Sequence, residues 1–185
     1  MGQRLKELSG QLEGDLFTDD TTKILYATDA SAYREIPLAV AIPKSIDDLK
    51  KLVAFAASNH TSLIPRTAGT SLAGQVVGNG IITDVSKNFT KIIELNAAEH
   101  WVRVQPGVRR DELNMFLKPH GLFFGPETST ANRAMMGGMV GNNSCGSNSI
   151  VYRSTREHLL EVKALLSDGS EATFKSVTLG EFHEK

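Results

Sequence analysis

Along the N-terminal part of the chain, apolar residues change from helical spacing to a strand-like run. Four leucines at helical spacing predict a short helix within residues 3–17, interrupted by two glycines. Residues 18–35 have turn formers and no sustained period, which predicts an irregular lead-in. The apolar run Leu38–Ile42 predicts a strand, which Pro43 ends.

The next segment has the pattern of a helix followed by a second strand. Ser45 is a candidate N-cap, and Asp48 three residues later would be the acidic half of a capping box. The residues expected on the buried face of this helix are Ile46, Leu49, Val53 and Ala56. A short strand is predicted at Ser62–Pro65, followed by a loop of small residues, Arg66–Gln75. This order predicts a βαβ unit with the loop at the C-terminal end of a strand, where open α/β sheets usually bind ligands.

The second half of the chain favours strands and a hairpin. Strands are predicted at residues 81–85, 91–95 and 101–104, and a helix at residues 110–118. Apolar alternation on both sides of Asp168–Gly169 predicts a β-hairpin with strands at 159–166 and 171–174. Strands and helices therefore both contribute, which indicates a mixed α and β domain.

Composition narrows the classes of partner. The 185 residues carry a net charge of -1 without a run of basic residues, which gives no reason to expect a nucleic-acid or membrane-surface partner. Cys145 is the only cysteine, so neither an intrachain disulfide nor a cysteine metal site is expected. The charged N-terminus does not resemble a signal peptide, and no apolar stretch is long enough to span a bilayer. We therefore expect a cytoplasmic protein without a transmembrane segment.

The loop Arg66–Gln75 has the composition of an anion-binding loop. Its small residues can turn backbone N–H groups inward around an anion, while Gly69 and Gly74 allow close approach. The two glycines have Walker A spacing, but Gln75 and Val76 stand where that motif needs lysine and a hydroxyl residue. No G-x-G-x-x-G sequence occurs either. A glycine-rich turn without a ligand remains the alternative.

The segment Gly125–Gly146 holds five glycines and many side-chain amides and hydroxyls. A long polar segment inside a compact domain is usually functional. Its mixture of glycine and methionine predicts a short helical piece packed beneath a ligand, with N-terminal N–H groups offered to phosphate. We interpret Met135 and Met136 as core residues. The residues favoured as ligand contacts in this segment are Gly137, Gly138, Asn142 and Gly146.

Taken together, these segments resemble the FAD-binding domain of the vanillyl-alcohol oxidase/p-cresol methylhydroxylase (PCMH) superfamily of FAD-linked oxidases. The resemblance runs from Tyr26 to the C-terminus and is greatest to the branch of D-lactate, D-2-hydroxyglutarate and glycolate dehydrogenase-type flavoproteins. Six motifs occur in the family's order: VAIPKSIDDLKKLVAFA, PRTAGTSLAGQ, VQPGV, GLFFGPETST, GGMVGNNSCGSNS and LLEVKALLSDGS. The resemblance implies an α+β, PCMH-type fold of two lobes with FAD between them.

The resemblance also implies which residues hold FAD. The pyrophosphate would contact Arg66, Thr67, Ala68, Gly69, Thr70, Ser71 and Gln75. The ribityl chain and flavin would contact Glu127, Thr128, Ser129, Ala134, Gly137, Gly138, Asn142 and Gly146. Val162 would contact the adenine through its backbone. Some members attach the flavin through a histidine in the first loop, but Ala68–Thr70 contains none, so we expect non-covalent FAD.

The domain boundaries expected from this resemblance are a lead-in at residues 1–35, a first FAD-binding lobe at 36–97 and an incomplete second lobe at 98–185. The family's enzymes are longer, and a cap domain carries their substrate-binding residues and usually the base. We therefore expect a truncated product, an isolated domain or a subunit that needs a partner. No catalytic residue can be named, and the five histidines lack metal-ligand spacing.

The implied activity is oxidation of a 2-hydroxy acid (D-lactate, D-2-hydroxyglutarate or glycolate type) by hydride transfer to FAD. The fragment alone is expected to be inactive. An iron–sulfur or other electron-acceptor partner is an open expectation, and such a partner could hold the protein at the periphery of a membrane. Two alternatives stay open: a flavin-binding module without turnover, and an unrelated α/β protein that binds a nucleotide phosphate.

Overall fold

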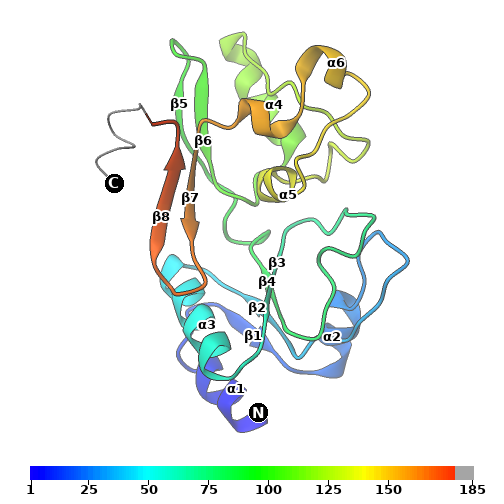
Figure 1. The fold of residues 1–185 in the computed structure, drawn as a ribbon, viewed down its shortest axis with the longest axis vertical. Coiled ribbons are helices and arrows are strands. Elements are labelled where there is room, and N and C mark those ends of the chain that lie inside the picture. The colour runs from blue at the N-terminus through cyan, green and yellow to red at the C-terminus, as the bar shows by residue number, and fades with distance from the viewer. Residues whose placement is uncertain (178–185) are drawn as a thin grey trace.

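The computed structural model describes residues 1–177, which form two lobes stacked along the long axis of the molecule (Figure 1). The first lobe, the lower one in Figure 1, contains α1 (Gly2–Ser9), β1 (Asp15–Phe17), α2 (Asp20–Tyr26), β2 (Ala39–Ile42), α3 (Ile46–Ser58), β3 (Leu63–Arg66) and β4 (Ile81–Asp84). The elements that follow along the chain are β5 (Ile92–Asn96), β6 (Trp101–Val104), α4 (Arg110–Leu117), η1 (Lys118–His120), α5 (Met136–Gly141), α6 (Ser149–Tyr152), η2 (Thr155–His158), β7 (Glu161–Leu165) and β8 (Glu171–Lys175). The fold is mixed α+β, as the sequence predicts.

A four-stranded sheet in the order β1-β2-β4-β3 forms the centre of the first lobe. β2 and β3 both run parallel to β4, which lies between them, and β1 runs antiparallel to β2. The predicted strand–helix–strand unit is confirmed as β2–α3–β3. The core residues of the first lobe are Leu5, Leu8, Ala39, Ala41, Leu52 and Ile81. Because β3 and β4 end side by side, the loop after β3 starts at the C-terminal edge of parallel strands.

Asp48 is a structural residue, and its predicted role in a capping box is wrong. Ser45 does cap α3, because its Oγ accepts a hydrogen bond from the Asp48 N–H at 3.2 Å. The Asp48 carboxylate accepts instead from the N–H groups of Glu13, Gly14 and Lys44, at 2.8 to 2.9 Å. It therefore ties the turn before β1 to the start of α3. Asp48 is fully buried on the same face of α3 as Leu52 and Ala56, while Ile46, expected on the buried face, is 48% exposed.

The pKa of Asp48 makes stability sensitive to acid. Burial disfavours the charged carboxylate, but the backbone N–H groups of Lys44, Glu13 and Gly14 more than offset this effect and hold the pKa of Asp48 below its usual value. A depressed carboxyl pKa contributes stability above the unfolded-state pKa of about 3.9, and the contribution is lost as the pH falls through the folded-state pKa. We expect Asp48→Asn to lower the free energy of unfolding at neutral pH by about 1–3 kcal/mol.

Urea unfolding at neutral and acidic pH checks this expectation. The wild type and Asp48→Asn should converge below the folded-state pKa of Asp48. The matched control is Asp47→Asn, which removes an exposed carboxylate paired with Lys51 on the same helix. It should cost less than about 1 kcal/mol. Equal losses for the two variants at neutral pH would contradict the role assigned to Asp48.

The first 35 residues belong to the first lobe instead of preceding it. Leu5 and Leu8 of α1 lie in the same core as the central strands, and β1 pairs with β2. The helix predicted within residues 3–17 ends at Ser9, and the last three residues of that range form β1. The irregular structure predicted at residues 18–35 is also partly wrong, because α2 forms there with Asp19 accepting from the Thr22 N–H at 2.9 Å.

The second lobe contains the antiparallel pair β5–β6, covered by α4 and α5. Its core residues are Val108, Leu113, Leu117, Ala134, Met136 and Met139. Ile92 and Leu95 of β5 pack against this core. The expected division of the lobes after residue 97 therefore falls within the β5–β6 hairpin, and β5 lies with the second lobe.

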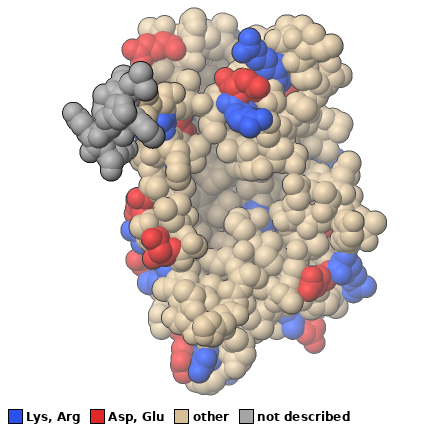
Figure 2. Space-filling view, in the orientation of Figure 1, with Lys and Arg blue, Asp and Glu red and all other residues tan. Residues whose placement is uncertain are grey.

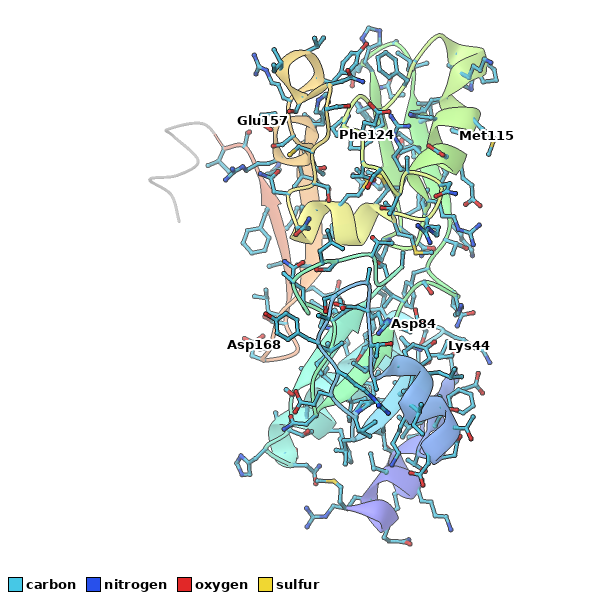
Figure 3. All side chains as sticks on the ribbon, turned by 90° about the vertical axis from the view of Figure 1, so that its right-hand side faces the viewer. Lys44, Asp84, Met115, Phe124, Glu157 and Asp168 are labelled. Carbon is cyan, nitrogen blue, oxygen red and sulfur yellow. The ribbon has the colours of Figure 1, made fainter. Side chains whose placement is uncertain are left out.

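The predicted hairpin around Asp168–Gly169 is confirmed as β7–β8, and it runs along one side of both lobes (Figures 1 and 3). Near its base, Arg103 Nη2 of β6 lies 3.1 Å from Glu161 Oε1 of β7. Near its turn, Lys50 Nζ of α3 lies 2.6 Å from Glu171 Oε1 of β8. The hairpin thus contacts each lobe through an ion pair. Within residues 1–177, no helix combines the length and apolar character that crossing a membrane requires.

Candidate functional site

The two glycine-rich segments meet between the lobes, where the surface is hollowed (Figure 2). The first loop follows β3 of the first lobe, and the second segment contains α5 of the second lobe. Gln75 Nε2 donates to Asn142 Oδ1 at 3.1 Å, which joins the two segments directly. A Cβ built on Gly138 would lie 2.7 Å from Thr67 Oγ1, so the backbones also approach closely at a second point. Residues separated by about 70 positions therefore form one site.

Two glycines shape the first loop by adopting left-handed backbone conformations. Gly69 has φ +65° and Gly74 has φ +69°. A Cβ at Gly69 would lie 2.7 Å from Arg66 Nη2, and one at Gly74 would lie 2.7 Å from the ring of Tyr33. The hydroxyl of Ser71 donates to Gln75 Oε1 across the turn. Both backbone conformations favour glycine, and a side chain at either position would also displace Arg66 or Tyr33.

Arg66 braces the start of the loop. Its Nη1 donates to the backbone carbonyls of Thr28 at 2.9 Å and Tyr26 at 3.3 Å, and its guanidinium carbon lies 5.2 Å from the Tyr26 ring centroid. The Tyr26 hydroxyl in turn donates to Asp84 Oδ2 at 2.6 Å. Burial, together with this hydrogen bond to Asp84, raises the pKa of Tyr26 far above its usual value, so the hydroxyl stays protonated. Arg66 thus positions the loop in addition to bringing positive charge.

The second segment contains the expected short helix, α5, but its first N–H groups are used within the protein. The N–H of Met136 donates to the Val108 carbonyl at 2.9 Å, and the N–H of Gly137 donates to the Pro106 carbonyl at 2.8 Å. A Cβ at Gly137 would lie 2.5 Å from Pro106 Cβ. Packing inside the second lobe therefore explains Gly137, whereas Gly138 faces the first loop. The core role predicted for Met135 and Met136 is confirmed, since each is 8% exposed.

The remaining predicted residues of this segment differ in how they are placed. A Cβ at Gly146 would lie 2.3 Å from the Glu127 carbonyl oxygen, so these two residues are in contact. The Glu127 carboxylate accepts from Asn148 Nδ2 at 2.6 Å. Thr128 Oγ1 is buried and has no hydrogen-bond partner in the described part of the chain. Ala134 is only 5% exposed and lies in the second core, where its side chain faces other apolar groups.

The other expected contacts lie around this centre. Thr67, Ala68, Thr70 and Ser71 are partly buried in the first loop, and Ser129 is exposed in the turn before α5. Val162 lies on β7, paired with Phe174 of β8, and is partly buried. Among the sixteen predicted residues, those of the first loop contact those of α5, and Glu127 contacts Gly146. Val162 lies apart from them on the β7–β8 hairpin.

A basic pocket of about 280 Å³ adjoins the first loop at the junction of the lobes. Arg66, Thr67 and Ala68 line it, together with residues that sequence reasoning missed, Lys87, Arg109 and Arg133. The one carboxylate among the residues that line this pocket is that of Asp84, which is labelled in Figure 3. The three missed cations lie far from one another in the sequence, so no local motif could have identified them as one group.

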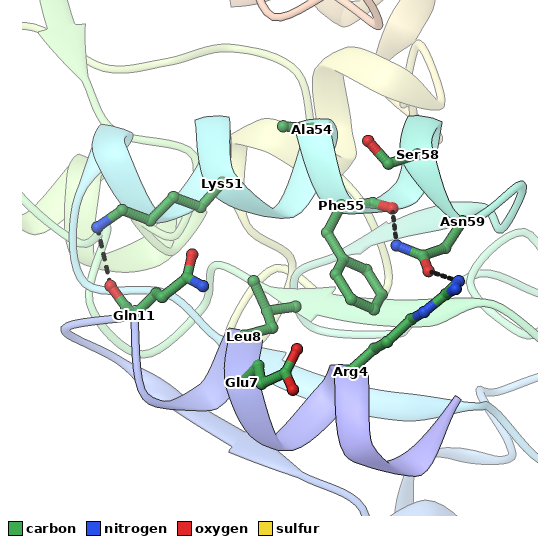
Figure 4. Close-up of a pocket in the computed structure, with 9 residues that line it drawn as sticks. All are labelled: Arg4, Glu7, Leu8, Gln11, Lys51, Ala54, Phe55, Ser58 and Asn59. Carbon is green, nitrogen blue, oxygen red and sulfur yellow. Dashed lines mark hydrogen bonds between the residues drawn. The ribbon is translucent and has the colours of Figure 1, made fainter.

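A larger pocket of about 500 Å³ lies between α1 and α3 in the first lobe (Figure 4). Arg4 Nη1 donates to Asn59 Oδ1 at 2.8 Å and Lys51 Nζ donates to the Gln11 carbonyl at 2.8 Å across it. None of the predicted cofactor residues lines this pocket. Although this pocket is larger, the predicted cofactor residues lie at the junction of the lobes, which is therefore the candidate site.

Residues 37–175 match the protein family described as FAD binding domain. Among curated proteins, the D-2-hydroxyglutarate dehydrogenase of Haemophilus influenzae is 44% identical over 160 residues, covering 85% of this chain and 16% of that protein. The glycolate oxidase subunit GlcD of Escherichia coli is 32% identical over 167 residues, covering 89% of this chain and 33% of that protein. The chain therefore spans between a sixth and a third of the length of these relatives.

Solved structures share the fold at low sequence identity. An alkyldihydroxyacetonephosphate synthase superposes with a TM-score of 0.82 at 17% identity, covering 98% of this chain and 38% of that chain. At this identity the likeness establishes the two-lobed fold alone.

Proposed function

Since the chain belongs to the FAD binding domain family and FAD is its cofactor, we propose that FAD lies between the two lobes, held by the first loop and by the segment around α5. The observation that carries this proposal is the direct contact between the two glycine-rich segments, through Gln75 with Asn142 and Thr67 with Gly138. Family membership supports FAD as the ligand, and this contact supports the proposal that FAD lies between the lobes.

The residues at this place fit a bound dinucleotide. Residues 66–75 contain no carboxylate, so nothing in the loop repels a pyrophosphate. Gly138 is exposed and has no side chain, which leaves backbone accessible opposite Thr67. The buried Thr128 hydroxyl has no partner in residues 1–177, and a buried polar atom of this kind is costly unless something else bonds to it. We propose that the pyrophosphate contacts the Gly69–Ser71 backbone and that the ribityl and flavin side faces Glu127–Ser129, Gly138 and Asn142.

Three of the expected contacts become indirect in this proposal. Gly137 and Gly146 allow the close packing of Pro106 and Glu127, and Ala134 fills the second core. They shape the segment that binds FAD. Val162 is proposed to contact the adenine through its backbone on β7, because β7 pairs with β8 on one edge and with no other strand of residues 1–177 on the other.

We propose that the longer protein represented by this chain oxidises a 2-hydroxy acid, of the class of D-2-hydroxyglutarate, D-lactate or glycolate. Bound FAD would supply the hydride acceptor, and this chain supplies its position and electrostatic environment. The support is similarity to a D-2-hydroxyglutarate dehydrogenase and a glycolate oxidase subunit. The only carboxylate among the residues assigned to the cleft, Glu127, already accepts a hydrogen bond from Asn148. We therefore propose that the 185-residue chain binds FAD without turning over substrate by itself.

Further parts of this proposal concern attachment, partner and place in the cell. FAD is non-covalent, because residues 68–70 offer no histidine for attachment. Electrons leave through an iron–sulfur or other acceptor partner. The protein is cytoplasmic, or peripheral at a membrane through that partner, and the single cysteine in 185 residues favours a reducing compartment.

Absorbance spectroscopy tests these proposals. The purified chain should show a flavin spectrum, and acid precipitation should release all the flavin into the supernatant; flavin left in the pellet would contradict non-covalent binding. D-2-hydroxyglutarate, D-lactate and glycolate should leave the flavin of the 185-residue chain oxidised. At least one of them should bleach the flavin of the longer protein, and the absence of bleaching with all three would rule out the proposed activity.

A further inference from the structure

The basic pocket at the junction has features that FAD binding does not explain. Both lobes line it. Tyr26 and Arg66 come from the first lobe, Lys87 from the segment after β4, and Arg109 and Arg133 from the second lobe. It lies at the C-terminal ends of the parallel strands β3 and β4, a position where open α/β sheets commonly bind ligands.

The charge of this pocket is unbalanced. Four cations, Arg66, Lys87, Arg109 and Arg133, line it together with a single carboxylate, Asp84. That carboxylate already accepts hydrogen bonds from the Tyr26 hydroxyl at 2.6 Å and the Ser86 N–H at 2.8 Å. Lys87 and Arg133 form no ion pair within residues 1–177, whereas Arg109 pairs with Glu112 at 2.5 Å. With Asp84 and the Glu112 partner of Arg109 both counted, the pocket keeps a net charge of about two positive units, which attracts an anion.

The pocket is separate from most of the proposed FAD contacts. Only Arg66, Thr67 and Ala68 belong to both sets. Gly138, Gln75 and Asn142 do not line the pocket, and the Arg66 Nη1 donor is occupied by backbone carbonyls. Thr67 therefore stands between the two sites, with its hydroxyl toward Gly138.

The size and donors of the pocket define the class of ligand. A volume of about 280 Å³ is below the roughly 300–1,000 Å³ of pockets that enclose drug-sized ligands, so a whole dinucleotide does not fit. Guanidinium groups bind phosphate and carboxylate through paired N–H donors, and a lysine adds a point charge. We propose that this pocket is a second anion site, which binds a small dianion such as inorganic phosphate or a short dicarboxylate next to bound FAD.

Isothermal titration of inorganic phosphate, and separately of succinate, into the FAD-loaded chain tests the proposal. We expect one of the two anions to bind with a single-site isotherm. The double variant Lys87→Gln/Arg133→Gln should weaken that binding by at least about tenfold, because two charge-assisted contacts are lost. The matched control Lys6→Gln/Lys118→Gln removes the same charge from exposed positions outside the pocket and should leave the affinity nearly unchanged. The tighter of the two anions identifies the natural class.

Three results would overturn the proposal. Absence of a single-site isotherm for both anions would show that the pocket is not an anion site. Equal weakening by the two double variants would show a general effect of charge. Binding to the FAD-free chain that disappears when FAD is bound would assign the pocket to the cofactor itself. The FAD absorbance of each sample reports separately on the proposed cofactor site, so a failure there is distinguishable.

Discussion

Gly69→Val is expected to abolish FAD retention. Gly69 has φ +65°, a conformation that costs a residue with a Cβ about 1–2 kcal/mol, and β-branching adds to that cost. The new side chain would also start 2.7 Å from Arg66 Nη2 and push the guanidinium from the carbonyls that hold it. The loop would then lose the backbone geometry proposed to bind the pyrophosphate. The flavin-to-protein ratio of purified protein, from absorbance, measures the effect.

Gly121→Val is the matched control for this variant. Gly121 has φ +68°, so valine there meets the same backbone strain, but no atom lies within 4 Å of its Cβ and it is remote from the first loop. Gly121→Val should retain FAD in spite of its lower stability. Stoichiometric FAD in folded Gly69→Val would show that the loop does not hold the cofactor in the way proposed.

Gly138→Val should weaken FAD binding by at least about tenfold, since it fills the approach between the two glycine-rich segments. Its Cβ would lie 2.7 Å from Thr67 Oγ1, so the lobes must separate or Thr67 must move. Gly141→Val lies on the same short helix with nothing within 4 Å of its Cβ, and should bind FAD like the wild type. FAD titration followed by flavin fluorescence compares them. Equal affinities for both variants would contradict the placement of FAD against Gly138.

The elements that the sequence predicts well are those with a strong local cause. Ala39–Ile42 is a continuous apolar run because β2 is buried within the sheet. Ser45 begins α3 through a cap that its own side chain makes. Asp168 accepts from the Ser170 N–H at 2.9 Å and holds the turn of the β7–β8 hairpin. In each case the deciding interaction lies within a few residues, so periodicity and turn chemistry are enough.

Elements decided by distant contacts could not be predicted in this way. Local spacing suggests a capping box for Asp48, but two of its three carboxylate hydrogen bonds come from Glu13 and Gly14, more than thirty positions earlier. The buried face of α3 therefore includes this carboxylate as well as Leu52 and Ala56. Similarly, β1 forms because β2 offers it an edge, and local spacing there favours helix. Tertiary contacts overrode local preference at these points.

The candidate site shows the same division. The positions of Gly69 and Gly138 can be predicted because small residues cluster there in the order of a known family. Why residues 137 and 146 are glycines cannot be predicted in this way, because the groups that exclude a side chain there are Pro106 and the Glu127 carbonyl. The cations Lys87, Arg109 and Arg133 come together only when the two lobes pack. No pattern along the chain indicates such a convergence.

The most direct test of the central claim is hydrogen exchange of the 185-residue chain, measured by mass spectrometry with and without saturating FAD. If both glycine-rich segments hold the cofactor, FAD should slow amide exchange in peptides covering residues 66–75 and 137–146. Exchange in α1, beside the larger pocket of the first lobe, should stay unchanged. Unchanged exchange in both glycine-rich segments, with protection appearing between α1 and α3 instead, would contradict the proposed site.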